Sequence, residues 1–246
     1  MTNFYIFPSD VDGDRVLFRG DEARHLCVVC RKTIGDVVSA VDGQGNELAV
    51  ILERVGPEEA AGRVIRLRRR TREPVVRVVL AQAITKSARM DLVIQKGTEL
   101  GVHRFIPVIT EHTVVSPDEP SSAKRQKRWQ KIAISAMKQC LRSRLPRVDA
   151  PMNFKQVLQE AVKADLTLMA SIVKDAKSLD RVFEACKAPR KILLLVGPEG
   201  GFTSQEISQA IQEKISLVSL GPRRLRAETA AILLVGLVLF KLGELG

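Results

Sequence analysis

The stretch ILLLVGPEGGFTSQEI, residues Ile192–Ile207, decides the fold of this chain. An apolar run typical of a buried strand leads into the turn Gly-Pro-Glu-Gly-Gly. Thr203, with Glu206 three residues later, forms a capping box that predicts the start of a helix. The turn between them lies at the carboxyl end of a strand, where α/β sheets bind ligands. It lacks the lysine of a phosphate-binding loop and carries Glu199. A ligand with hydroxyl groups or positive charge therefore suits it, the alternative being a tight turn without a ligand.

A second turn of this kind lies in SLVSLGPRRLRAETAAILL, residues Ser216–Leu234. Gly197 and Gly221 follow strand-like runs that look adjacent, so the two loops are expected to converge on one cleft. Arg226 and Glu228 precede a helix that is apolar on every side, and such a helix must be buried in the core or in a subunit interface. These two polar residues are either helix caps or ligand contacts.

The C-terminal region as a whole alternates apolar strands with helices. One expected helix ends at Gly101, and a long helix follows a Pro/Ser-rich loop at residues 116–124. The expected strands lie at residues 75–84, 104–110, 165–173, 191–196 and 215–220. This order predicts an α/β fold with a parallel sheet covered on both faces.

The first 70 or so residues have a different pattern, of short runs rich in valine, isoleucine and phenylalanine. DGQGN (Asp42–Asn46) between two such runs predicts a hairpin turn, and GDEARHLCVVCR (Gly20–Arg31) predicts a short helix. Several short strands with one helix indicate a small β-barrel. The charged stretch RLRRRTREP (residues 66–74) marks the boundary, which gives domains at 1–72 and 73–246.

Charge points to a polyanionic partner. Lys and Arg number 39 against 28 Asp and Glu, a net charge of +11, and nine basic residues with no acidic one lie between Lys124 and Arg147. Helical periodicity places Lys131, Lys138 and Arg142 opposite an apolar stripe, where they would face solvent or phosphate. Nucleic acid is therefore favoured over a membrane, and the alternative is a solvated basic helix face.

No signal peptide is visible, and the longest apolar run, Ala230–Phe240, is too short to span a bilayer. The four cysteines fit a reduced compartment, so a cytoplasmic protein without membrane contact is expected. Cys27 and Cys30 lack the second pair or histidine that would complete a zinc site, and their apolar neighbours favour burial. No metal is expected.

Six segments carry a family resemblance: HLCVVCR, VDGQGNE, TKSARMDLVIQKGTELGVHRFIPV, RWQKIAISAMKQCLRSRLP, LLVGPEGGFTSQEI and LGPRRLRAETAAI. In this order they resemble the bacterial 16S rRNA (uracil-1498-N3)-methyltransferase family, a branch of the SPOUT class of S-adenosylmethionine-dependent RNA methyltransferases. The resemblance implies a PUA-like β-barrel that binds RNA at 1–72. It implies a SPOUT methyltransferase domain with a C-terminal trefoil knot at 73–246. It also implies S-adenosylmethionine as cofactor, 16S rRNA of the small ribosomal subunit as partner, and a homodimer.

The same resemblance assigns roles to residues. Arg226 is the candidate for stabilising the uracil anion, and Glu228 is a candidate base that could equally orient Arg226 or cap the helix. The expected cofactor-binding residues are Met169, Ala170, Ser171, Gly197, Pro198, Glu199, Gly200, Gly201, Leu220, Gly221, Leu225 and Arg226. The expected RNA-binding residues are His25, Arg31, Lys86, Arg89, Lys131, Lys138 and Arg142. The alternative to RNA binding for His25 and Arg31 is packing within the barrel. The alternative for Lys86 and Arg89 is a position on a solvated turn.

Two other functions stay open at this point. One is a SPOUT methyltransferase with a different RNA target, and the other is a ribosome-binding module without catalysis. The second would keep the basic helix but would not need the GPEGG and LRAETA turns.

Overall fold

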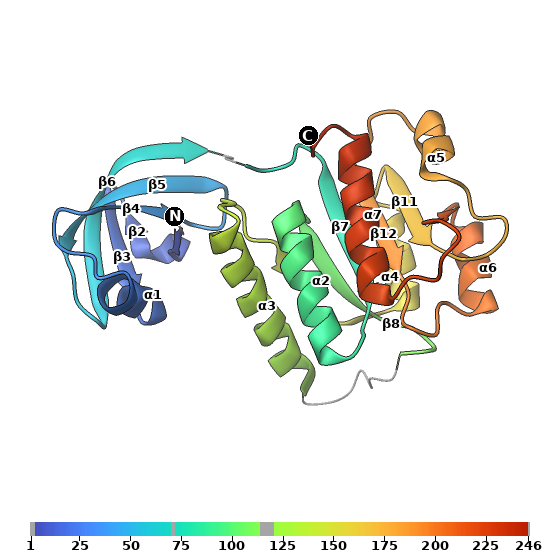
Figure 1. Ribbon diagram of the computed structural model, residues 1–246, viewed down its shortest axis with the longest axis horizontal. Coiled ribbons are helices and arrows are strands. Elements are labelled where there is room, and N and C mark those ends of the chain that lie inside the picture. The colour runs from blue at the N-terminus through green and yellow to red at the C-terminus, as the bar shows by residue number, and fades with distance from the viewer. Residues whose placement is uncertain (1–2, 70–71, 114–120, 246) are drawn as a thin grey trace. The chain divides into compact units, whose positions relative to one another are not determined.

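The computed structural model describes residues 3–69, 72–113 and 121–245 (Figure 1). The packing of Cα atoms divides the chain into two compact units, one formed by Met1–Glu73 with Ala133–Leu145 and the other by Pro74–Ile132 with Pro146–Gly246. The sequence predicts one domain over 73–246, whereas 133–145 packs with the first unit. Residues 116–120 of the expected Pro/Ser-rich loop lie outside the described residues.

The first unit is built on a six-stranded sheet in the order β1-β4-β5-β6-β3-β2, curled into a half-barrel (Figure 1). Neighbouring strands are antiparallel except β1 and β4, which are parallel. The strands are β1 (Phe4–Tyr5), β2 (Val11–Asp12), β3 (Arg15–Arg19), β4 (Val37–Val41), β5 (Asn46–Arg54) and β6 (Glu59–Arg69). Alternate apolar residues of β5, Leu48, Val50 and Leu52, point into the core because side chains alternate between the faces of a strand.

Both local predictions in this unit are confirmed. The expected helix forms as α1 (Asp21–Arg24) continued by the π-helical turn η2 (His25–Val29), after the short helix η1 (Pro8–Asp10). The expected hairpin turn joins β4 to β5, and the Asp42 carboxylate accepts hydrogen bonds from the backbone N–H of Gln44 (2.8 Å) and Asn46 (3.1 Å). This Asx geometry fixes the turn.

The second unit contains the predicted parallel sheet. Its order is β10-β8-β7-β12-β11-β13, with β9 beside β8, and every pair is parallel. The strands are β7 (Arg77–Ala83), β8 (Arg104–Ile109), β9 (Arg147–Val148), β10 (Met152–Asn153), β11 (Leu166–Ala170), β12 (Lys191–Val196) and β13 (Ser216–Val218). One expectation was wrong: the strands before Gly197 and Gly221 are not adjacent, because β11 lies between them.

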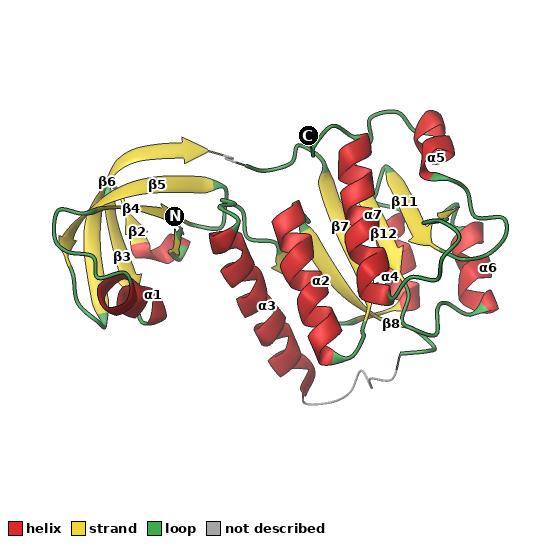
Figure 2. Cartoon of the chain, in the orientation of Figure 1, coloured by secondary structure: helices red, strands yellow, loops and turns green. Residues whose placement is uncertain are grey.

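Helices cover both faces of this sheet (Figure 2). On one face α2 packs against α7, and α7 also contacts β7 and β12. On the other face α4 contacts β8 and α6 contacts β13, around a core that includes Leu193 and Leu195. The helices of this unit are α2 (Ser87–Leu100), α4 (Phe154–Ala161), α5 (Leu179–Ala185), α6 (Ser204–Gln212) and α7 (Ala227–Lys241). The long helix α3 (Ser121–Gln139) is divided between the two units at Ile132.

Local sequence signals set the ends of two of these helices. Gly101 ends α2 in the left-handed conformation (φ 111°), which glycine adopts without steric cost. Thr203 begins α6 through the predicted capping box: its side chain accepts the Glu206 N–H, and the Glu206 carboxylate accepts the Thr203 N–H at 2.9 Å. In the part of the chain that the structure describes, no helix combines the length and the apolar character needed to cross a membrane.

Candidate functional site

A pocket of about 750 Å³ opens in the second unit where β11, β12 and β13 end. This is within the size range of small-molecule sites. Three segments form it: the end of β11, the GPEGG turn after β12, and the loop between β13 and α7. The lining residues are Arg89, Ala170, Ser171, Ile172, Val173, Val196, Gly197, Pro198, Glu199, Gly200, Gly201, Phe202, Ser204, Ile207, Leu220, Gly221, Arg223, Arg224, Leu225, Arg226, Ala227 and Ala230.

The GPEGG turn follows β12 and is closed by a hydrogen bond from the Gly201 N–H to the Pro198 carbonyl at 2.9 Å. Gly201 has a φ of 72°, in the left-handed region that glycine tolerates. At Gly197 a side chain would begin 3.1 Å from the Phe202 ring. The Gly197 carbonyl also lies 3.5 Å from the amide nitrogen of Gln82, which is fully buried on β7. Glycine at these positions lets the turn fold tightly over its own aromatic neighbour.

The loop after β8 supports the turn from outside. His112 Nδ1 is hydrogen bonded to the Gly201 carbonyl at 3.1 Å. The Glu206 carboxylate, whose other oxygen belongs to the capping box, accepts the backbone N–H of Glu111 at 3.1 Å. These contacts could not be predicted from the sequence, because nothing in the local pattern connects residue 112 with a turn almost ninety residues later.

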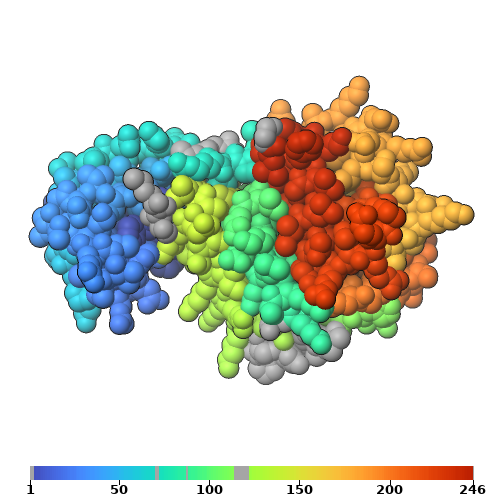
Figure 3. Space-filling view, viewed as in Figure 1, coloured from blue at the N-terminus to red at the C-terminus, as the bar shows by residue number. Residues whose placement is uncertain are grey.

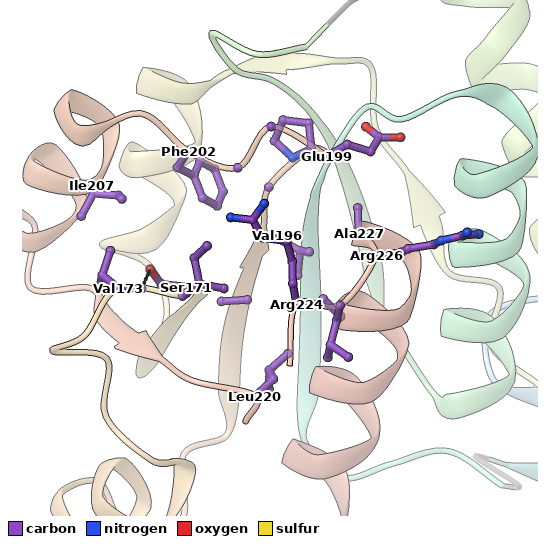
Figure 4. A pocket seen from close by; sticks show the side chains of 18 of the residues that line it. Ser171, Val173, Val196, Glu199, Phe202, Ile207, Leu220, Arg224, Arg226 and Ala227 are labelled. Atoms are coloured by element: carbon purple, nitrogen blue, oxygen red, sulfur yellow. Dashed lines mark hydrogen bonds between the residues drawn. The ribbon is translucent and has the colours of Figure 1, made fainter. Parts of the chain in front are cut away.

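The other two walls come from 170–173 and 220–227 (Figure 4). The Ser171 N–H donates to the Val218 carbonyl at 2.9 Å, which ties the end of β11 to β13. In Figure 4, Ser171 and Phe202 lie on one side of the pocket, with Arg226 and Ala227 on the opposite side. The order β12-β11-β13 explains the convergence, since all three strands end at one edge of the sheet.

The structure brings together all the predicted cofactor-binding residues except Met169. Met169 is fully buried in the core that faces α4 and α6, so its side chain does not line the pocket. The sequence pattern did not predict the apolar wall of the pocket, which is formed by Ile172, Val173, Phe202 and Ile207. Phe202 directly follows the predicted turn, and an aromatic residue there could have been read as part of the site.

Arg226 and Glu228, the two candidate catalytic residues, occupy different environments. Arg226 lines the pocket, is exposed, and precedes α7 without capping it through its side chain. Glu228 is 8% exposed, does not line the pocket, and has one oxygen, Oε2, that is buried without a hydrogen-bond partner among the described residues. Arg226 therefore belongs to the wall of the pocket, with its side chain directed away from the pocket centre in Figure 4, whereas Glu228 does not line the pocket.

Arg89 connects the pocket to Glu228. Its guanidinium forms an ion pair with the Glu199 carboxylate, and its Nε lies 3.8 Å from Oε1 of Glu228. Arg89 was expected to contact RNA phosphate, whereas in the structure it faces two carboxylates at the rim of the pocket.

The other predicted RNA-binding residues differ in their exposure to solvent. Lys86, Lys131 and Arg31 are exposed, in line with surface contacts. His25 is half-buried in the helical turn, with its ring centroid 5.4 Å from that of Phe4, so barrel packing is observed for its side chain.

Two basic residues expected on the solvent face of the long helix, Lys138 and Arg142, instead pair with carboxylates. Arg142 is 3% exposed and forms a buried ion pair with Glu73 at 2.8 Å. The helix ends at Gln139 and Leu141 has a φ of 63°, so helical periodicity no longer applies at residue 142. Lys138 is half-buried and pairs with Glu22.

The cysteines show no metal site. Within the described ranges, no group of three or more His, Cys, Asp or Glu side chains could hold a metal ion, and all four cysteines are free. Cys30 is exposed, contrary to the expected burial, because it follows the π-helical turn at the surface.

Known proteins share this fold and these segments. Residues 71–239 match the RNA methyltransferase domain family, and residues 18–65 match the RNA methyltransferase PUA domain. The chain therefore belongs to the RNA methyltransferases. Ribosomal RNA small subunit methyltransferase E of Bacillus subtilis is 32% identical over 87% of this chain and 85% of its own length. The chain is a member of the ribosomal RNA small subunit methyltransferase E family.

Two solved structures are similar over nearly their whole length. A methyltransferase from Legionella pneumophila in complex with S-adenosylmethionine has a TM-score of 0.87 and 32% identity. Ribosomal RNA small subunit methyltransferase E from Neisseria gonorrhoeae, also bound to S-adenosylmethionine, has a TM-score of 0.87 and 31% identity. Each match covers 98% of this chain and 98% of the chain in the solved structure.

Proposed function

We propose that this chain methylates N3 of uridine 1498 in 16S rRNA of the small ribosomal subunit, with S-adenosylmethionine as the methyl donor. The observation that carries the proposal is the pocket at the ends of β11, β12 and β13, in a fold shared with two proteins solved with that cofactor.

The pocket fits the donor by its chemistry. Val173, Phe202 and Ile207 give one wall an apolar surface suited to an adenine ring, while the turns expose backbone N–H and C=O groups to its polar edge. Glu199 adds a carboxylate at the rim, which suits ribose hydroxyls as a hydrogen-bond acceptor. S-adenosylmethionine supplies a methyl group on a sulfonium, which passes to uracil N3 as the neutral thioether leaves.

Arg226 is the residue we assign to the uracil. N3 of uracil carries a proton, so this proton must pass to solvent and leave an imide anion whose charge spreads over two carbonyl oxygens. A guanidinium offers paired donors that match such an anion, and Arg226 lines the pocket with no other hydrogen bond or ion pair described for its side chain. Its role is to hold the anion in place for transfer.

The apolar helix α7 supports a homodimer. Leu234, Val235 and Val238 are buried against the rest of the unit, yet Leu233 is 37% and Phe240 63% exposed. Figure 3 shows α7 (red) at the surface beside α2 (green). An exposed apolar strip on a core helix is typical of a subunit interface. We assign this face of α7 to dimerisation. We also assign to the second unit a trefoil knot, formed by its C-terminal loops.

We assign RNA contacts to the half-barrel and to the exposed cations Lys131, Lys86 and Arg31. The match of residues 18–65 to an RNA methyltransferase PUA domain supports RNA contacts by the half-barrel. Lys131 lies on the exposed side of α3 in a run with no acidic residue, where phosphate contacts would add a salt-dependent affinity.

Methyl transfer to small subunits from a strain that lacks the enzyme tests the proposal. Labelled S-adenosylmethionine is the donor, and the RNA is digested to nucleosides that are resolved by mass. We expect N3-methyluridine, and a loss of at least about 100-fold in kcat for Arg226→Ala. A different methylated nucleoside would keep the enzyme class but change the target. Cofactor binding without transfer to any RNA would favour a non-catalytic ribosome-binding module.

A further inference from the structure

Glu228 is a buried carboxylate outside the pocket, and its surroundings define what it can do. Its side chain is 10% exposed and it is the second residue of α7, where the helix dipole favours negative charge. A base must reach the proton that it removes. Glu228 does not line the pocket, whereas its Oε1 lies 3.8 Å from Arg89 Nε.

Arg89 has two carboxylate neighbours of unequal exposure. Its guanidinium contacts Glu199, whose side chain is 41% exposed, and approaches Glu228, which is almost fully enclosed. An exposed ion pair alone holds a side chain weakly, because water competes for both charges. A buried carboxylate on the other side fixes the guanidinium, because leaving that carboxylate without a cation is costly.

We infer that Arg89 and Glu228 are positioning residues for the cofactor turn: Glu228 holds the Arg89 guanidinium, and Arg89 holds Glu199. Through Glu199 this bridge ties α2 and the start of α7 to the GPEGG turn and keeps the turn in its binding shape. The inference rests on the proposed function, since it concerns how the same site binds S-adenosylmethionine. It replaces the earlier assignment of Glu228 as a candidate base.

The bridge also sets the charge of Glu199. With Arg89 in place the Glu199 carboxylate is already paired, so it can orient hydroxyl groups but offers little net attraction to a cation. The neutral product S-adenosylhomocysteine should therefore respond to changes in the bridge as the charged donor does.

The test uses calorimetric titration of the full chain with S-adenosylmethionine and with S-adenosylhomocysteine. Four variants are compared: Glu228→Gln, Arg89→Met, the double variant, and Glu199→Gln. We expect Glu228→Gln and Glu199→Gln to weaken both ligands roughly three- to tenfold, the range of partly buried ion pairs. Arg89→Met should weaken them at least as much. The double variant should match Arg89→Met, because Glu228 acts through Arg89.

Lys96→Met is the matched control. It removes one cation from the same helix α2, whose ion pair with Glu99 lies outside the pocket, and should leave both dissociation constants unchanged. Thermal unfolding checks that each variant is folded. If Arg89→Met proves unfolded, Glu228→Gln still tests the bridge, because Glu228 does not line the pocket and acts on the turn only through Arg89.

Steady-state methyl transfer separates positioning from base catalysis. A positioning role raises the KM for S-adenosylmethionine in Glu228→Gln while kcat stays within about twofold. A fall in kcat of about 100-fold or more, with a lost limb of the pH–rate profile and unchanged ligand affinity, would overturn the inference in favour of a base. Additive effects in the double variant, or unchanged affinities throughout, would also overturn it. Failure of the unaltered chain to bind the donor would instead refute the proposed function.

Discussion

Gly200 lies so close to His112 that a side chain at residue 200 would crowd the imidazole. A Cβ atom there would lie 3.1 Å from both Cβ and Cγ of His112. The neighbouring Gly201 carbonyl is hydrogen bonded to the same imidazole. A larger residue at position 200 would therefore push His112 and the GPEGG turn apart by a few tenths of an ångström.

Gly200→Ala should weaken S-adenosylmethionine binding by about fivefold or more, because the added methyl group pushes the turn away from His112. Calorimetric titration measures this effect. Adding His112→Ala removes the ring carbon but keeps Cβ, so the double variant should recover part of the lost affinity. Wild-type affinity in Gly200→Ala would show that the loop after β8 does not support the turn.

Gly62→Ala should destabilise the half-barrel by about 2 kcal/mol, a typical cost of forcing an atom into a packed site. A Cβ at residue 62 would collide with the backbone carbonyl oxygen of Ile51 and lie 2.6 Å from Cγ1 of Val50. Hydrogen exchange should accelerate in β5 and β6, while β7 and β12 serve as an internal control. Equal acceleration in both units would contradict this local explanation.

Thr203→Ala should lower the free energy of unfolding by about 1 kcal/mol, the usual value of a helix N-cap. The side chain accepts the Glu206 N–H at 3.2 Å, and alanine cannot replace that bond. Thr203→Ser keeps the hydroxyl and should stay close to wild type. Urea unfolding measures all three proteins, and a serine variant as unstable as the alanine variant would point to the lost methyl group.

The Glu160 carboxylate should stabilise the fold in a pH-dependent way. Hydrogen bonds from Lys163 and then Arg104 lower its pKa from the ordinary value of 4.5, so folding favours the ionised form. The resulting stability is present above the unfolded-state pKa and is lost as the pH falls through the lower folded-state pKa. Glu160→Gln should therefore cost about 1 kcal/mol at pH 7 and progressively less below pH 4.5.

Urea unfolding of wild type and Glu160→Gln from pH 7 down to pH 3 measures this trend. Lys155→Gln, on the exposed side of α4, serves as the control and should show no such trend. A difference between wild type and Glu160→Gln that stays constant over this range would contradict the ionic explanation.

Local chemistry made much of this fold predictable. The strand runs, the Thr203 capping box and the Gly101 helix end depend on residues close in sequence, and all three are confirmed. The two glycine turns could be predicted to meet because parallel strands end at the same edge of a sheet. The parallel sheet followed from apolar strands alternating with helices.

Nonlocal packing limited the rest. Hydrophobic pattern does not fix strand order, so the position of β11 between β12 and β13 was not foreseen. It also does not reveal that Met169 faces the core, or that the helix before Arg142 ends early enough for this arginine to pair with Glu73. The approach of Arg89 to Glu199 depends on packing between residues 110 positions apart.

Backbone amide chemical-shift mapping with S-adenosylmethionine tests the central claim most directly, namely that the three loops at the ends of β11, β12 and β13 hold the methyl donor. We predict that the largest shifts fall at 170–173, 197–202 and 220–227, and that S-adenosylhomocysteine produces the same pattern. Saturable shifts confined to other segments, with these three loops unchanged, would contradict the account.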